Sequence, residues 1–147
     1  KVFNFFVEDP SNYDENFKRI RIRNLIKNLE LEGLDKKKLE LTIKNLKDSD
    51  NAINFYLKQN IKKNAIFLKD SNTYLLNKNF FNQPNEIIFR SFIYIMRKIS
   101  NRYYSARGKS VSELISKIKF KKLKKATLGG CIIERINETI LISREIT

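Results

Sequence analysis

Three cations recur at helical spacing near the start of the chain and are suited to binding phosphate groups. Arg19, Arg23 and Lys27 occupy positions i, i+4 and i+8, which places them on one face of a predicted helix. An adjoining apolar stripe is formed by Ile22, Leu25, Ile26 and Leu29. Guanidinium groups beside a buried face suit phosphate oxygens, because each presents several donors in a fixed plane. The other interpretation is an ordinary core helix with a solvated basic face, the commoner role of a charge run.

A second basic region runs from Arg102 to Lys125. Its candidate phosphate-binding residues are Arg102, Arg107, Lys109, Lys121 and Lys122. Tyr103 and Tyr104 are candidates for stacking on unpaired bases, the usual means of discriminating RNA. Alternatively, the two tyrosines pack against the helix ends. Phosphate contacts of this kind supply affinity and orientation rather than sequence reading.

Composition favours a folded protein that binds a polyanion. The chain has 147 residues, of which 41% are hydrophobic and 12% aromatic, enough for one domain with a core. Its net charge is +14 and its pI is about 9.9, an excess that favours nucleic acid or an anionic membrane surface. Lys, Asn and Ile are abundant together, as in AT-rich coding sequences, so part of the lysine excess need not serve function.

The sequence offers few groups for catalysis. It contains 0 His and 1 Cys, so we predict no metal site, no internal disulfide and no nucleophile activated by histidine. We expect Cys131 to be a buried small hydrophobe. No glycine-rich phosphate loop is present, and no apolar run is long enough to cross a bilayer. We therefore expect a cytoplasmic chain that does not bind membranes and is inactive by itself.

Hydrophobic periodicity predicts a mainly α fold, a small bundle of about four helices with two short β-hairpins. The helices are expected over residues 14–31 and 36–59, after Pro84, and from a capping box at Ser110–Glu113. The helix after Pro84 is apolar nearly all round except for Arg90, Arg97 and Lys98, so we expect it to be central.

The hairpins are expected over residues 65–76 and 131–143. Gly129 and Gly130 should permit a sharp turn before the second one. Asp50 interrupts the apolar face of the second helix. We expect it either to pair with an arginine of the first helix or to mark an exposed, frayed spot.

Both ends of the chain resemble tRNA(Ile)-lysidine synthetase. Asp9, Ser11, Asn12, Arg19 and Arg23 match a motif of that family position by position, whereas Ile20 stands where many members have Asn. Residues 127–132 and 142–145 look like the close of the shorter, alphaproteobacterial-type members. The resemblance therefore extends over nearly the whole chain.

The resemblance implies an enzyme that uses ATP to attach lysine to the first anticodon cytidine of tRNA(Ile). Residues 1–16 would be the junction from an upstream domain that binds ATP with Mg, and 17–147 the helical tRNA-binding domain. Arg19 would be catalytic, beside the cleft, while Asp9, Ser11 and Asn12 would shape the junction. The chain begins with Lys1, so we expect a trimmed piece of a longer protein. Two alternatives are a stand-alone basic RNA-binding module and a scaffold that binds acidic proteins.

Overall fold

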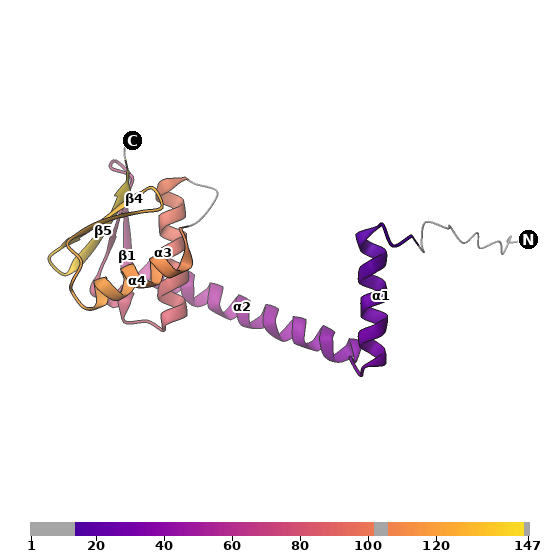
Figure 1. Cartoon of the computed structure of the whole chain (residues 1–147). Helices are drawn as coiled ribbons and strands as arrows, with labels where there is room; N and C mark the ends of the chain where they lie inside the picture. The colour runs from indigo at the N-terminus through magenta and orange to yellow at the C-terminus, as the bar shows by residue number, and fades with distance from the viewer. Residues whose placement is uncertain (1–13, 102–105, 146–147) are drawn as a thin grey trace, which may run out of the picture. The chain divides into compact units, whose positions relative to one another are not determined.

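The computed structural model describes residues 14–101 and 106–145. They belong to two compact units, Lys1–Asp48 and Ser49–Thr147. The first unit contains α1 (Lys18–Leu31) and the start of α2 (Lys36–Asn64). The second contains the end of α2 and all described strands (Figure 1). The described part thus holds four α-helices and one small sheet, which confirms the mainly α fold class.

The first helix begins later than predicted. Asp14 does not cap it, because its side chain accepts a hydrogen bond from the backbone N–H of Asn16 at 2.9 Å within a preceding turn. Phe17, in an extended conformation, is the N-cap instead. The helix ends as expected at Leu31, followed by Gly33 in the left-handed region at φ +95°.

The predicted apolar stripe of α1 is not buried within its unit. Ile22, Leu25, Ile26 and Leu29 are all exposed. Ile20, which lies off that stripe, is the buried residue of the helix, with 2% of its surface exposed. The neighbouring start of α2 is itself exposed at its apolar positions, so the described part of this unit lacks a second surface large enough to cover the stripe.

The second helix runs to Asn64 rather than to about residue 59. Asp35 caps its start, accepting from the backbone N–H of Lys37 at 2.8 Å. The last turn of α2 is stabilised by Asn60, which is only 3% exposed. Its amide nitrogen donates to the Phe80 carbonyl at 3.4 Å and to Ser91 Oγ at 3.3 Å, while its oxygen accepts from Asn64 Nδ2 at 2.9 Å. Asn60 thus connects α2 to the segment of Phe80 and to the helix of Ser91 through buried hydrogen bonds.

The strands form one five-stranded antiparallel sheet in the order β1-β2-β5-β4-β3. Their bounds are β1 (Ala65–Leu68), β2 (Thr73–Leu76), β3 (Lys125–Leu128), β4 (Cys131–Ile136) and β5 (Thr139–Arg144). Both predicted hairpins are confirmed, and pairing of β2 with β5 joins them. Strand β3 was not predicted, because its four residues follow a lysine run and are stabilised by pairing with β4 rather than by their own pattern.

Helix α3 (Asn85–Ser100) lies at the centre of the second unit, as predicted. Ile88, Phe92, Ile95 and Ile99 are buried, and the helix packs against β4 and β5 with α4 (Gly108–Lys119) beside it (Figure 1). The sheet contributes Leu76, Ile133, Ile140 and Ile142 to the same core. A short 3-10 helix, η2 (Lys78–Phe81), connects β2 to α3.

The predicted capping box is wrong. Helix α4 begins at Gly108, with Arg107 as N-cap and no side-chain cap, so Ser110 already lies in the first turn. The cause is the backbone: the N–H of Val111 donates to the Arg107 carbonyl at 3.1 Å, which closes a helical turn two residues before the predicted start. The buried side of the helix is nevertheless the predicted one: Val111, Leu114, Ile115 and Ile118.

We expect Asn60→Ala to lower the free energy of unfolding by about 2 kcal/mol, because it leaves the buried Phe80 carbonyl and Ser91 hydroxyl without this partner. Urea unfolding followed by circular dichroism measures the change. Asn51→Ala, an exposed position on the same helix, is the control and should alter stability by less than about 0.5 kcal/mol. Equal losses in the two variants would contradict a structural role for Asn60.

Candidate nucleic-acid interface

The three cations predicted on α1 are all exposed. Arg19, Arg23 and Lys27 lie on the surface of the first unit, and none forms an ion pair with a described residue. The Arg19 guanidinium lies 5.5 Å from the centroid of the Phe17 ring, a contact that limits its motion while leaving its charge in place. Arg21, which the sequence did not single out, donates to the Glu15 carbonyl at 2.9 Å instead. As far as the described residues go, Arg19, Arg23 and Lys27 are thus available to contact an anion.

The second predicted cluster separates into two groups. Arg107 and Lys109 are exposed at the beginning of α4, whereas Lys121 and Lys122 are exposed just after its end. A helix of 12 residues separates them by about 18 Å. Lys121 also pairs with Glu138, with Nζ 3.2 Å from Oε1. Arg102, Tyr103 and Tyr104 lie outside the described residues, as do Asp9, Ser11 and Asn12, so their roles remain predictions.

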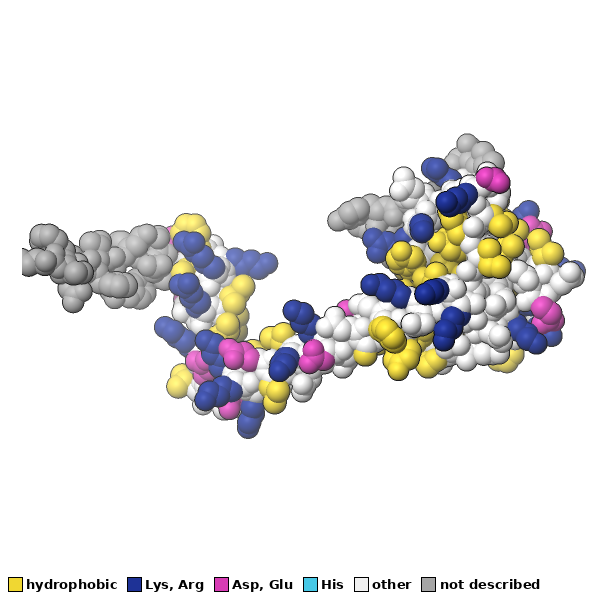
Figure 2. All heavy atoms as spheres, turned by 180° about the vertical axis from the view of Figure 1, so that it is seen from behind, with side chains coloured by type: hydrophobic (Ala, Val, Ile, Leu, Met, Phe, Trp, Pro, Cys, Tyr) yellow, Lys and Arg dark blue, Asp and Glu magenta, His cyan; other side chains and the backbone are white. Residues whose placement is uncertain are grey.

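Basic side chains are spread over the surfaces of both units. Figure 2 shows Lys and Arg at many places on the visible face, with fewer Asp and Glu among them. Charge alone therefore does not single out a site, and shape must be considered with it.

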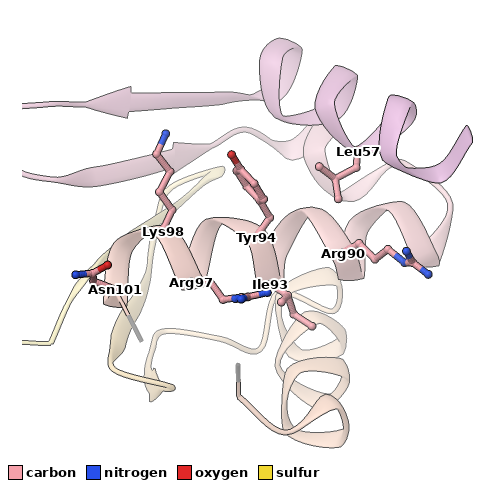
Figure 3. A pocket seen from close by; sticks show the side chains of 7 residues that line it. All are labelled: Leu57, Arg90, Ile93, Tyr94, Arg97, Lys98 and Asn101. Carbon is pink, nitrogen blue, oxygen red and sulfur yellow. The ribbon is translucent and has the colours of Figure 1, made fainter. Parts of the chain in front are cut away.

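A groove of about 800 Å³ lies along the outer face of α3 (Figure 3). It is lined by Leu57, Arg90, Ile93, Tyr94, Arg97, Lys98 and Asn101. Leu57 belongs to α2, and the other six residues belong to α3 or follow it directly. Because Arg90, Tyr94 and Lys98 are spaced by four residues, they share the helix face that the core does not use. We call this the α3 groove.

Tyr94 is the aromatic residue of the α3 groove, with 50% of its surface exposed. In Figure 3 its ring and the Lys98 side chain extend from α3 in the same direction, and Leu57 faces the helix from α2. Arg97 lies along the helix beside Ile93, and Asn101 stands at the far end. An exposed ring flanked by cations is an arrangement suited to a nucleotide.

Arg90 is held by two carboxylates. Its Nε lies 2.6 Å from Glu86 Oε1 and its Nη1 lies 2.5 Å from Asp50 Oδ1. The hydrogen bond to Glu86, and next the one to Asp50, raise the pKa of Arg90. Asp50 is exposed, as one of the two alternatives expected, but it lies within α2 rather than at a frayed end. The other alternative, pairing with an arginine of the first helix, is wrong, since its ion-pair partner comes from α3. That pair links α2 to α3 at one end of the groove.

Lys98 is held in a different way. Its Nζ lies 5.2 Å from the centroid of Phe67 and 5.7 Å from that of Tyr74. A side-chain hydrogen bond with Tyr74 raises the pKa of Lys98 above its ordinary value. Arg97, in contrast, is exposed, and its side chain forms no hydrogen bond or ion pair with any described residue. It is the groove cation whose donors are available to a ligand.

Sequence reasoning missed this groove. It noted Arg90, Arg97 and Lys98 as exceptions on an apolar helix, but it did not connect them with Tyr94. The spacing of Tyr94 four residues from both Arg90 and Lys98 was the available signal. Leu57 had no such signal, because its place depends on how α2 packs against α3.

The needs of a metal site and of a membrane-crossing helix can be compared with the described ranges. No group of three or more His, Cys, Asp or Glu side chains is placed there to hold a metal ion. Cys131 is buried, as predicted. Among the described helices, none is both long and apolar enough to cross a bilayer.

The chain is similar to curated tRNA(Ile)-lysidine synthases. It is 28% identical over 142 residues to the protein of Wolbachia pipientis wMel and 29% identical over 146 residues to that of Wolbachia sp. subsp. Brugia malayi. The protein of Ruegeria pomeroyi is 26% identical over 140 residues. Each alignment covers 95% of this chain and 33% of the relative, so the chain spans about a third of their length. No family model and no solved structure matches it. The resemblance found in the sequence is confirmed.

Replacing Tyr74 by Phe should lower the pKa of Lys98 toward the ordinary 10.5, because the variant keeps the ring and removes the hydroxyl. Since the native pKa is raised, this interaction contributes its full stability below the unfolded-state pKa and loses it as pH rises through the folded-state pKa. NMR titration of 13C-methylated lysines measures the shift. Tyr56→Phe is the control, and an unaltered Lys98 titration in Tyr74→Phe would refute the assignment.

Proposed function

We propose that this chain is the tRNA-binding part of a tRNA(Ile)-lysidine synthetase. The observation that carries the proposal is the similarity to proteins of that name over 95% of the chain. A net charge of +14 and exposed cations on both units support binding to a nucleic acid backbone. On this proposal, the chain positions the anticodon region of tRNA(Ile) for a catalytic domain in the cytoplasm.

The reaction of the whole enzyme belongs to the proposal as well. ATP, with Mg, would adenylate the cytidine in an upstream domain, and the amine of lysine would then displace AMP. This chain has only 4 glycines and no glycine-rich loop to hold the phosphates of ATP, so its own contribution is to bind and orient. Arg19 is the residue proposed to act beside the cleft, stabilising negative charge on the adenylated intermediate. Its guanidinium is exposed and forms no ion pair with a described residue, which suits that role.

The alternatives differ in what the cations bind. A stand-alone RNA-binding module would bind tRNA in the same way without an attached enzyme. A scaffold for acidic proteins would use the same charge, but it would give no reason for an exposed tyrosine among the cations of the α3 groove. The tRNA proposal accounts for the positive charge, for the exposed tyrosine and for the similarity to the synthases.

Binding of tRNA(Ile) to this chain should weaken steeply with salt. Each phosphate neutralised contributes nearly one unit to the slope of log K against log salt, so we expect a slope of about −3 or steeper. Fluorescence anisotropy of labelled tRNA across a salt series gives this slope. Weak binding that does not respond to salt would reject the tRNA proposal and favour the scaffold.

In the full-length enzyme, Arg19→Ala should reduce lysine transfer about a hundredfold, comparable with the loss of one charge-stabilising donor from an active site. Single-turnover transfer of labelled lysine to tRNA(Ile) measures the step directly. Lys18→Ala removes an adjacent exposed charge and is the matched control, expected to change transfer little. If Arg19→Ala kept both transfer and tRNA binding, Arg19 would have no part in the mechanism.

A further inference from the structure

We infer that the α3 groove binds one unpaired nucleotide of the RNA, with its base stacked on Tyr94 and its phosphate at Arg97. This inference rests on the proposed function and specifies which part of the RNA the groove accepts. Nothing in the similarity to the synthases points to these residues. They are assigned by exposure, spacing and the partners of the neighbouring cations.

Tyr94 provides a surface on which a base can stack. Its ring is half exposed on a helix whose opposite face is fully buried, so the core does not require an aromatic side chain at this position. Leu57 and Ile93 supply apolar walls to the groove, and Leu57 faces α3 from α2 (Figure 3). Every base has a π-face, so stacking on such a ring is favourable and tolerant of sequence. A volume of about 800 Å³ lies within the range of pockets that take small organic ligands and is ample for one nucleotide.

The cations of the groove have separate roles. Arg90 is committed to Asp50 and Glu86, and Lys98 is committed to the Phe67 and Tyr74 rings. Arg97 has no such partner among the described residues, and its side chain starts three positions from Tyr94. One available guanidinium and one exposed ring lining the same groove match a single phosphate and its base. They do not match the continuous row of phosphates on a duplex.

The geometry favours an unpaired nucleotide over an RNA helix. In an A-form duplex the bases are stacked on each other, and the faces needed by Tyr94 are hidden. An unpaired nucleotide can turn its base outward and place its own phosphate nearby. Asn101 stands at the end of the groove with a left-handed backbone at φ 53°, and its amide offers both a donor and an acceptor for a base edge.

The test compares variants of this chain in binding a single-stranded oligoadenylate, the duplex formed with its complement, and tRNA(Ile). Tyr94→Leu should weaken binding of the single strand about tenfold, the effect expected for the loss of one stacked base. Tyr94→Phe should retain binding because the ring remains. Arg97→Gln should weaken binding and reduce the salt slope by about 0.7, the value for one phosphate of a single strand.

Tyr56→Leu is the matched control. Tyr56 is an exposed tyrosine of α2 that does not line the groove, and its replacement should leave affinity unchanged. Thermal melting shows whether each variant folds. If Tyr94→Leu fails to fold, quenching of 2-aminopurine in the single strand by the unaltered chain gives an independent reading of base stacking. Quenching supports the inference, and unchanged fluorescence overturns it.

The outcomes separate this inference from the function on which it rests. If tRNA(Ile) binds with a steep salt slope but Tyr94→Leu binds every RNA as the unaltered chain does, the groove assignment fails and the tRNA-binding proposal stands. Equal losses in Tyr56→Leu and Tyr94→Leu, or equal affinity for the duplex, also overturn the groove assignment. If the unaltered chain binds no tRNA, the proposed function itself fails. An acidic peptide that binds with the same dependence on Tyr94 would overturn the nucleotide as the ligand.

Discussion

The organisation of the second unit depends on one-sided burial of α3. Ile88, Phe92, Ile95 and Ile99 fill the space against the sheet and leave almost no surface to solvent. Because a helix turns about 100° per residue, fixing that face also fixes the direction of every other side chain on the helix. The directions of the solvent-facing side chains of α3 are therefore as well determined as those of its buried side chains. Tyr94 is displayed on the solvent-facing side as a consequence of packing on the opposite side.

The other wall of the α3 groove is positioned by polar contacts. Asn60 joins the end of α2 to η2 and α3, while Asp50 joins an earlier turn of α2 to Arg90. Leu57 lies between these two attachments in sequence and is only 8% exposed. The buried Asn60 bonds contribute more than the Asp50 pair, since the latter is half exposed and screened by solvent. These contacts fix the end of α2 before and after Leu57, the residue through which α2 lines the groove.

Local patterns predicted local structure well. Periodicity and turn residues predicted the order of the helices, both hairpins and the central place of α3. Features that depend on distant pairing were not predicted. Strand β3 exists through its pairing with β4, and the partner of Asp50 is 40 positions away. The same holds for the candidate site. The spacing of residues predicted the α1 cations, whereas the α3 groove exists only because α2 and α3 pack together.

Net charge overstates the number of cations available for binding. Arg90 and Lys98 are used to attach α3 to its neighbours, and Arg135 donates from Nη2 to the Ile118 carbonyl near the C-terminal end of α4. A cation at that end of a helix interacts favourably with the helix dipole, which is a structural use of charge. Arg97, Arg23 and Lys27 have no such use among the described residues, and Arg19 contacts the neighbouring Phe17 ring without an ion pair to a described residue. A basic residue whose charge is not satisfied by the fold is therefore a better guide to an RNA contact than a basic residue counted in the composition.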